Sequence, residues 1–206
     1  MQEFTFDTFK EYLLQQAKAK NACSEEYIKA YNSKSWSALL QVIKDNICWC
    51  YRNNILFVEI MRRLPQQVLI DNNIYVDQTQ VVQRDGFAIY YNSTSEHYDN
   101  STSKHYGNST SKHYGNSTSE HHNNSTSNHY YNSTSEHYDN STSKHYDNST
   151  SKHYDRSTSE HYGSSTSGSV HVLKNVNVIT DQAIVRERST GKVYFKKNAF
   201  ETVQID

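Results

Sequence analysis

The chain has 206 residues, of which 34% are hydrophobic, and a formal net charge of −1 at pH 7. This length leaves room for one domain, or for a small domain followed by a repeat array. Because the charge is balanced, there is no basic field for nucleic acid or an anionic membrane, and we expect neither as a partner.

Cysteine usage and the lack of targeting signals bear on the compartment. No apolar run reaches the roughly 18 residues of a membrane span, and residues 1–4 lack the basic-then-apolar pattern of a signal peptide. The cysteines Cys23, Cys48 and Cys50 are odd in number and lie in or beside helical patterns. We therefore expect reduced thiols and a cytoplasmic location, with a virion-associated location as the alternative.

Residues 4–64 carry the period of amphipathic helices. The first helix presents one apolar face, formed by Phe6, Phe9, Leu13 and Ala17. For the second helix, Ser24 is the expected N-cap, with Glu25 and Glu26 in the first turn, where the helix dipole favours anions.

The third helix has the strongest apolar pattern, and Ser35 is its expected N-cap. Its apolar positions are Trp36, Leu39, Leu40, Ile43, Ile47 and Cys50. A fourth helix, at about residues 56–64, is expected to end at Pro65, which cannot continue it. The Cys48-Trp49-Cys50 segment is interpreted as buried packing rather than a redox site. Two cysteines separated by one residue on a helix direct their sulfur atoms apart.

Residues 92–163 repeat one octapeptide nine times, Asn-Ser-Thr-Ser-x-His-Tyr-(Asp/Gly). A short fixed period indicates a solenoid or fibre, in which each unit is buried by its neighbours. Position x holds Glu, Lys or Asn and must face water, so alternation places Thr and Tyr outward and Ser and His inward. The (Asp/Gly)-Asn pairs predict tight turns, so each octad is one strand and one turn.

The octad before the array, residues 84–91, is expected to form the first strand of the solenoid. In the same register it places Phe87 and Ile89 at the inward Ser and His positions. Disorder is the rival interpretation, because polar Ser/Asn-rich tracts usually cannot offset their chain entropy. The regular Tyr and His spacing and the apolar ends favour the folded array.

Charges at position x predict how many octads form one coil. Strand plus turn only reverses direction, so two octads are expected to close a flat coil of sixteen residues. At that spacing four opposite pairs become neighbours, and Glu120 and Glu136 form one like pair. A spacing of eight residues also gives four opposite pairs but two like pairs, Lys104–Lys112 and Lys144–Lys152, so the sixteen-residue coil is slightly favoured. The opposite pairs at sixteen residues are Glu96–Lys112, Lys104–Glu120, Glu136–Lys152 and Lys144–Glu160.

Beyond the array, apolar residues return at Val170, Val172, Val176, Val178 and Ile179. A hairpin is expected from residues 183–187 and 193–195, with its turn at residues 189–192. The predicted fold class is α+β. It comprises a helical domain and cap at 1–75, an octapeptide-repeat β-solenoid at 76–171 and a C-terminal β cap at 172–206.

The register Thr-Ser-x-His-Tyr-(Asp/Gly)-Asn-Ser resembles octapeptide solenoid repeats of the type Thr-Val-x-Ala-Tyr-(Asp/Gly)-Ser-Ala. Those repeats belong to an uncharacterised family in intestinal anaerobes and their phages and mobile elements. There a helical segment with a Lys-Asp-Asn…Trp-Cys stretch precedes the array, as Lys44-Asp45-Asn46 and Trp49-Cys50 do here. The resemblance implies a phage or mobile-element origin and brings no activity. A looser likeness is to the trimeric octapeptide needle of phage spikes, whose Val-x-Gly signature is missing here.

The repeated histidines invite a metal site, but a stacked column spreads its ligands in parallel, and we expect no metal and no cofactor. No nucleophile–base pair, phosphate loop or carboxylate pair occurs outside the repeat, so we expect no enzyme activity. The candidate binding residues are an outward tyrosine column, in which His122 substitutes once. These residues are Tyr98, Tyr106, Tyr114, Tyr130, Tyr138, Tyr146, Tyr154 and Tyr162.

The function expected from the sequence is a non-catalytic binding module that engages a host protein. A glycan is the alternative partner. The purely structural interpretation is that stacking of the tyrosines only stabilises the sheet. The second functional class is a structural spacer or trimeric fibre component of a phage particle. A monomer or homodimer is favoured over a trimer.

Overall fold

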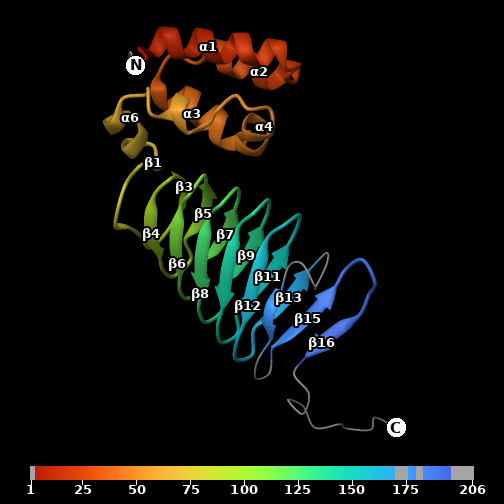
Figure 1. Cartoon of the computed structure of the whole chain (residues 1–206). Coiled ribbons are helices and arrows are strands. Elements are labelled where there is room, and N and C mark those ends of the chain that lie inside the picture. Colours follow the sequence, from red (N-terminus) through yellow and green to blue (C-terminus); the bar gives the residue numbers. More distant parts are fainter. Residues whose placement is uncertain (1–2, 170–175, 180–182, 196–206) are drawn as a thin grey trace. The chain divides into compact units, whose positions relative to one another are not determined.

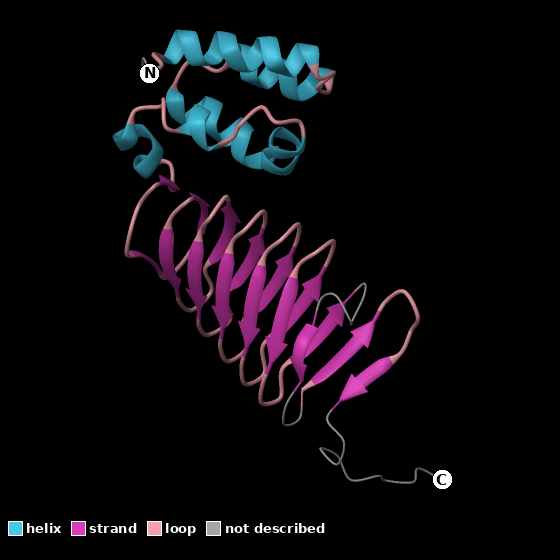
Figure 2. Cartoon of the chain, in the orientation of Figure 1, coloured by secondary structure: helices cyan, strands magenta, loops and turns pink. Residues whose placement is uncertain are grey.

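The computed structural model describes residues 3–169, 176–179 and 183–195 (Figure 1). The chain divides into two compact units, Met1–Val76 and Asp77–Asp206. The first is mainly helical and the second is built of strands (Figure 2). The predicted order of a helical region, a β-solenoid and a C-terminal hairpin is confirmed. Val170 and Val172 lie outside the described residues.

The helical unit has an apolar core formed by short amphipathic helices. Phe9 and Leu13 are buried on one face as predicted, and Trp36 packs on Phe9 with ring centroids 5.7 Å apart. A short strand, β1 (Ile74–Val76), ends the unit. Its helices are α1 (Phe6–Ala19), α2 (Ser24–Asn32), α3 (Trp36–Asp45), α4 (Ile47–Arg52), α5 (Val58–Met61) and α6 (Gln66–Asp71).

The helix boundaries differ from the sequence prediction at three places. Ser35 caps α3 as predicted, accepting a hydrogen bond from the Ala38 amide at 3.3 Å. Ser24, however, is the first residue of α2 rather than its N-cap, because Cys23 holds the extended backbone of that position.

The predicted third helix is broken at Asn46. Its side-chain amide donates to the Val42 carbonyl at 2.9 Å and to Glu26 Oε2 at 2.7 Å. Such side-chain bonds compete with the helical ladder, and Asn46 separates α3 from α4. The pattern of apolar residues runs through this break, which is why periodicity alone missed it.

The predicted fourth helix is shorter than expected, and one helix was missed. Only Val58–Met61 is helical before Pro65. Pro65 then precedes α6 as its N-cap residue. The first backbone N–H groups of a helix make no intrahelical hydrogen bond. A proline, which has no N–H group, therefore loses no helical hydrogen bond at that position.

The second unit is a flat solenoid of two parallel sheets in which successive strands alternate between sheets. Sheet A contains, in spatial order, β3 (Phe87–Tyr91), β5 (Thr102–Tyr106), β7 (Thr118–His121), β9 (Thr134–His137), β11 (Thr150–His153), β13 (Thr166–Ser169), β15 (Ile184–Glu187) and β16 (Val193–Phe195). Sheet B contains β2 (Val81–Gln83), β4 (Thr94–His97), β6 (Thr110–His113), β8 (Thr126–His129), β10 (Thr142–His145), β12 (Thr158–His161) and β14 (Val176–Ile179).

The coil repeat is sixteen residues, as the charge pattern predicted. Thr94 pairs with Thr110 in sheet B, and Thr118 pairs with Thr134 in sheet A. The last residue of each octad lies in the turn between strands and has positive φ, for example Asp99 at 54° and Gly107 at 70°. The turns are also tied between coils, since Asp139 Oδ2 accepts from the Asn123 amide at 3.0 Å.

The register of the first rung was predicted wrongly. Phe87 pairs with Thr102 rather than with Ser103, so Ala88 and Tyr90 take the inward Ser and His positions. The coil from β3 to β5 is one residue shorter than the regular coil, and this reverses the facing of every side chain in β3. Both Ala88 and Tyr90 are buried.

The predicted C-terminal hairpin is confirmed. β15 and β16 pair antiparallel, with Val185 opposite Tyr194. Gly191, at φ 72°, lies in the connection, where its amide donates to the Glu187 carbonyl at 2.8 Å.

Candidate functional site

The solenoid interior contains two facing histidine columns rather than the single column expected. Because successive octads alternate between sheets, the histidines divide between them. Within a column the rings are stacked with centroids 4.4–4.8 Å apart. Between the columns the rings meet edge to face at 5.1–5.9 Å. Column A is His105, His121, His137 and His153, and column B is His97, His113, His129, His145 and His161.

Each of these nine histidines is fully buried and bonded to the serine two residues earlier. Nε2 of His97 lies 2.8 Å from Ser95 Oγ, and Nε2 of His129 lies 2.9 Å from Ser127 Oγ. The second ring nitrogen is less well satisfied. For five histidines Nδ1 has no hydrogen-bond partner among the described residues: His105, His113, His121, His129 and His145.

Burial keeps these imidazoles neutral. Desolvation lowers the pKa of His97, His129 and His161 to about 3. For the other six, desolvation is again the largest cause, and neighbouring histidines lower the pKa further. The interior is therefore an uncharged stack at neutral pH.

The two columns bring histidine nitrogens closer together than a single column would. In four groups of three, one nitrogen from each ring lies within 4.8 Å of the others. A zinc ion bound at about 2.0–2.1 Å needs converging lone pairs. The stacked rings of one column are nearly parallel, at 6–9°, so their lone pairs point in similar directions. The rings would have to tilt out of their stacks to bind a metal, and the expectation of no metal stays a prediction.

Each serine–histidine pair has the spacing of a nucleophile and its base, but it cannot reach a substrate. Ser127 is 1% exposed and His129 is 0% exposed. A catalytic pair must contact the reacting group. We therefore assign these pairs to the structure of the core.

The predicted tyrosine column is also divided into two ladders, one on each sheet. Ladder B contains Tyr98, Tyr114, Tyr130, Tyr146 and Tyr162, with centroids 4.9–5.1 Å apart. Ladder A contains Tyr91, Tyr106, His122, Tyr138 and Tyr154, with centroids 4.8–5.2 Å apart. Tyr91 was missed by the sequence reasoning, because the shorter first coil moves it into line with Tyr106.

The tyrosines differ in exposure and in what their hydroxyls contact. Tyr106 is fully buried, so it cannot contact a partner, whereas the other predicted tyrosines are half-buried. The hydroxyls of Tyr98, Tyr138 and Tyr162 donate to the glutamates two residues earlier. The Tyr154 hydroxyl accepts a bond from Arg188 Nη1 at 2.9 Å.

Three consecutive rungs of ladder B have hydroxyls without a hydrogen-bond partner in the described part of the chain. These are Tyr114, Tyr130 and Tyr146, whose rings are stacked within 6–8° of parallel. Stacking fixes the rings, so the hydroxyls form a row spaced at the strand separation. We call this set the free tyrosine row.

The outer charges are neutralised in pairs, as predicted from the sixteen-residue spacing. The four opposite pairs have N–O distances of 2.8–3.2 Å. The like pair, Glu120 and Glu136, lies in register in sheet A. His122 beside Glu120, together with Lys104, lowers the pKa of the Glu120 carboxyl to about 2.

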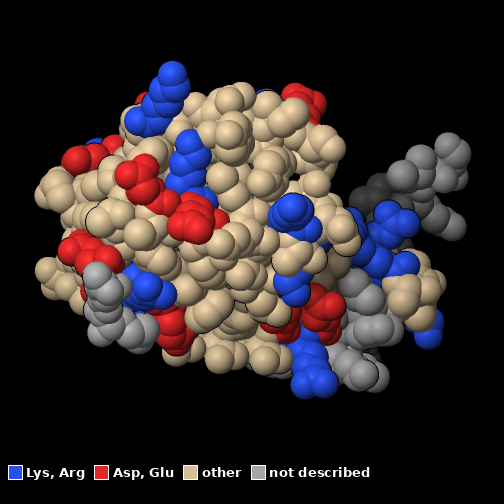
Figure 3. Space-filling view, turned by 90° about the horizontal axis from the view of Figure 1, so that it is seen from above, with Lys and Arg blue, Asp and Glu red and all other residues tan. Residues whose placement is uncertain are grey.

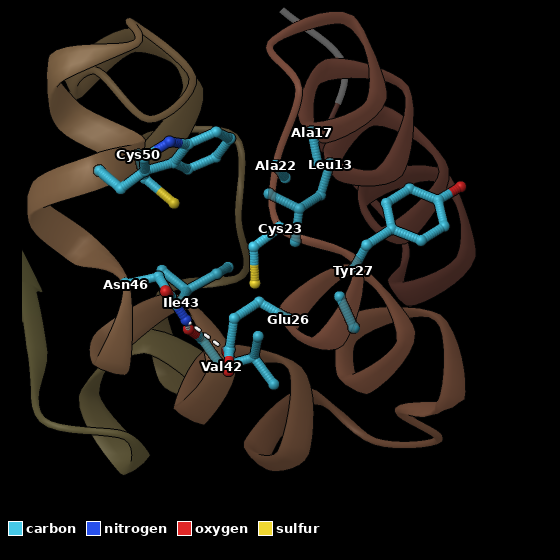
Figure 4. Close-up of a pocket in the computed structure, with 12 residues that line it drawn as sticks. Leu13, Ala17, Ala22, Cys23, Glu26, Tyr27, Val42, Ile43, Asn46 and Cys50 are labelled. Carbon is cyan, nitrogen blue, oxygen red and sulfur yellow. Dashed lines mark hydrogen bonds between the residues drawn. The ribbon is translucent and has the colours of Figure 1, made fainter.

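The helical unit also contains an apolar cavity of about 160 Å³ (Figure 4). Figure 4 shows Cys23 and Glu26 directed into it, with the Glu26–Asn46 hydrogen bond at its edge. Cys50 also lines it, and burial raises the pKa of the Cys50 thiol to about 12. Such a thiol is unreactive, which agrees with the interpretation of packed cysteines.

Comparison with protein-family models, with curated proteins and with solved structures finds no match to this chain. Among the helices of the described ranges, none has the length and hydropathy needed to cross a membrane. On the face seen in Figure 3, positive and negative side chains are interspersed among uncharged residues.

Proposed function

We propose that this chain is a non-catalytic binding protein whose solenoid presents the free tyrosine row to a partner protein. The observation that carries the proposal is the set of three stacked, half-buried tyrosines with unpaired hydroxyls at Tyr114, Tyr130 and Tyr146. Tyrosines held in one rotamer lose little entropy on binding and supply both apolar area and a polar end.

The orientation of the rings favours a protein over a glycan. Within each ladder the rings cover each other's faces, so they present edges and hydroxyls outward. A sugar ring packs on an exposed aromatic face, whereas a protein surface can accept edge contacts and hydrogen bonds. The paired charges beside the row leave it close to neutral, which argues against nucleic acid.

The resemblance of the repeat to those of intestinal anaerobes and their mobile elements supports a phage or mobile-element origin. On that basis we propose a host protein as the partner and the cytoplasm as the compartment. Each coil is completed within one chain by pairing of residues sixteen apart. This supports a monomer or homodimer over an intertwined trimer, which is the form that a spacer or needle component would take.

The test is capture of partners on the immobilised full chain, using lysate from candidate host cells. We expect a discrete protein to be retained, and to be lost from a triple variant with Tyr114, Tyr130 and Tyr146 changed to Phe. That variant keeps ring stacking and removes only the hydroxyls. The matched control changes Tyr98 and Tyr162 to Phe, whose hydroxyls are already bonded to glutamates.

Two results would contradict the proposal. One is a partner retained equally by the triple variant and its control. The other is the absence of any partner together with a native mass three times the 24.0 kDa of the chain, which would favour the fibre or spacer function.

A further inference from the structure

The outer face of sheet A carries an open hollow of about 580 Å³ near its C-terminal end. It lies over the pairing of β11, β13 and β15 and is lined by Lys152, Thr166, Gly168, Arg186 and Arg188 together with neighbouring residues.

The hollow lies where the pairing of charges along the solenoid is interrupted. Every lysine of the regular repeats that faces outward is bonded to a glutamate one coil away. Arg186 breaks this rule, because its register neighbours are Gly168 on one side and Val193 on the other. Arg186 is exposed and has no ion-pair partner among the residues that the structure describes.

Gly168 creates the space, and Arg188 crosses it. Gly168 stands at position x of its coil, directly between Lys152 and Arg186. A Cβ there would lie 3.3 Å from Arg188 Nε, so the Arg188 side chain passes over the glycine. Its position is fixed by Tyr154, whose hydroxyl it contacts at 2.9 Å and whose ring lies 5.5 Å from the guanidinium carbon.

The cations are close enough to act together. At about 4.8 Å between strands, Lys152 and Arg186 are roughly 10 Å apart at the backbone, with Arg188 between them. Glu136 raises the pKa of Lys152, and the nearby charge of Arg188 opposes that shift. One carboxylate, Glu136, offsets one of the three cations, which leaves a local charge of two.

The hollow also has a hydrogen-bond donor besides its cations. Thr166, at an outward position of β13, is an exposed hydroxyl on its floor. Guanidinium and hydroxyl donors around a twofold positive charge match a tetrahedral oxyanion.

We propose that this hollow binds a phosphomonoester dianion, either inorganic phosphate or the phosphate group of a small metabolite. A phosphomonoester carries a charge of about −1.5 to −2 at pH 7, which matches the unpaired charge of the hollow better than a carboxylate does. A nucleic acid backbone is a worse match, since the paired charges elsewhere on the face provide no continuing basic track. The site is on sheet A and is independent of the free tyrosine row on sheet B.

The experiment is calorimetric titration of the full chain with inorganic phosphate at low ionic strength. Two variants remove the site in different ways. Arg186→Gln deletes one of the two cations that no carboxylate offsets, and Gly168→Glu restores the alternation of charges by placing a carboxylate between Lys152 and Arg186. Since Gly168 has no positive φ and only the flexible Arg188 side chain lies near its Cβ, the second variant keeps the fold.

Controls test the geometry and the ligand. Gly168→Ala adds only the Cβ, and Lys112→Gln removes a lysine that is paired with Glu96 on the other sheet. Sodium acetate, as a monoanion, tests whether any anion suffices. Glucose 6-phosphate tests the source of the phosphate group. If it binds more tightly than inorganic phosphate, the ligand is a phosphorylated metabolite. If inorganic phosphate binds at least as tightly, the ligand is phosphate itself.

We expect saturable phosphate binding that is weakened about tenfold or more by Arg186→Gln and by Gly168→Glu, the effect of losing one charge-assisted hydrogen bond. Gly168→Ala and Lys112→Gln should bind as the unmodified chain does. The proposal is overturned if phosphate does not bind saturably, if acetate binds equally well, or if Gly168→Glu binds phosphate unchanged while melting at the same temperature.

Discussion

The two units of this chain are stabilised by different physics. The helical unit buries aliphatic and aromatic side chains such as Phe9, Leu39 and Leu40, so its stability comes from transfer of apolar surface. The solenoid buries serine and histidine at almost every inward position. Its stability must come from the backbone ladder, from serine–histidine bonds and from ring stacking. One core is indifferent to pH, and the other requires every imidazole to be neutral.

The largest expected effect is therefore selective loss of the solenoid in acid. The folded-state pKa of the interior histidines is depressed, to about 3 for His97 and His129, from an ordinary value of 6.5. Between those values the unfolded chain binds more protons, so stability is fully present above pH 6.5 and falls as the pH drops below it. Each histidine can contribute up to about 1.4 kcal/mol per pH unit, against a usual total of about 5–15 kcal/mol.

Spectroscopy can follow the two units separately in the full chain. Both tryptophans, Trp36 and Trp49, lie in the helical unit, whereas the strand signal in circular dichroism comes from the solenoid. We expect the strand signal to be lost between pH 6.5 and pH 4 while tryptophan emission stays native. The solenoid should also melt at a lower temperature at pH 5 than at pH 8. Equal melting at both values would contradict a buried histidine core.

Deleting repeats tests the pairing that makes the polar core possible. Removal of sixteen residues, 124–139, keeps every downstream strand in its own sheet, because strands pair at that spacing. Removal of eight residues, 124–131, transfers the downstream strands and the hairpin to the other sheet. We expect the first variant to be a monomer with a cooperative melt, and the second to melt far lower. Equal tolerance, with a trimeric mass, would indicate a needle.

The two inward serines of the octapeptide, at its second and fourth positions, should differ in how much they stabilise the solenoid. Ser127 Oγ lies 2.9 Å from His129 Nε2, whereas Ser133 Oγ has no hydrogen-bond partner among the described residues. Ser127→Ala leaves a buried ring nitrogen unsatisfied and should cost about 1–3 kcal/mol of unfolding free energy. Ser133→Ala removes an unpaired hydroxyl and should be neutral or stabilising. Denaturant unfolding measures both, and equal losses would mean that the serine–histidine bond does not stabilise the core.

The smallest effect concerns a strained turn. Tyr131 occupies the last position of its octad with φ 58° and is 59% exposed. Other octads place Asp, Asn or Gly there, which adopt positive φ more easily. Tyr131→Gly should raise the unfolding free energy by about 1 kcal/mol without affecting the core. A loss of stability would show that the exposed ring makes a contact that stabilises the turn.

The inward positions and the coil length of the solenoid could be predicted from the sequence because each follows from one regular feature of the repeat. Alternation along a strand determined which residues face inward, and the charge pairs at sixteen residues determined the coil length, as Lys104 and Glu120 confirm. The single-column picture was wrong for both His and Tyr, since octads were not assigned to sheets. Where the repeat is irregular, prediction failed: a coil shorter by one residue put Tyr90 rather than Ile89 in line with the histidines.

In the helical unit and at the candidate sites, the decisive signals are local contacts that a pattern does not contain. The break between α3 and α4 depends on the Asn46 side chain reaching the Val42 carbonyl. The free tyrosine row is an exception, because its hydroxyls differ from those of Tyr98 and Tyr162 through the residue at position x, which is glutamate beside the latter two. The sequence contains this signal, and it was not used. The hollow at Gly168 depends on two strands, β13 and β15, that lie outside the nine regular copies.

The most direct test of a neutral histidine core is the protonation state of the imidazoles in the folded chain. Nitrogen-15 NMR of histidine-labelled protein at pH 6 distinguishes neutral from protonated rings. We predict that the nine interior histidines remain neutral at pH 6, with no gradual titration near 6.5 before the solenoid unfolds. Rings that titrate individually with pKa values near 6.5 while the strand signal is intact would contradict the account.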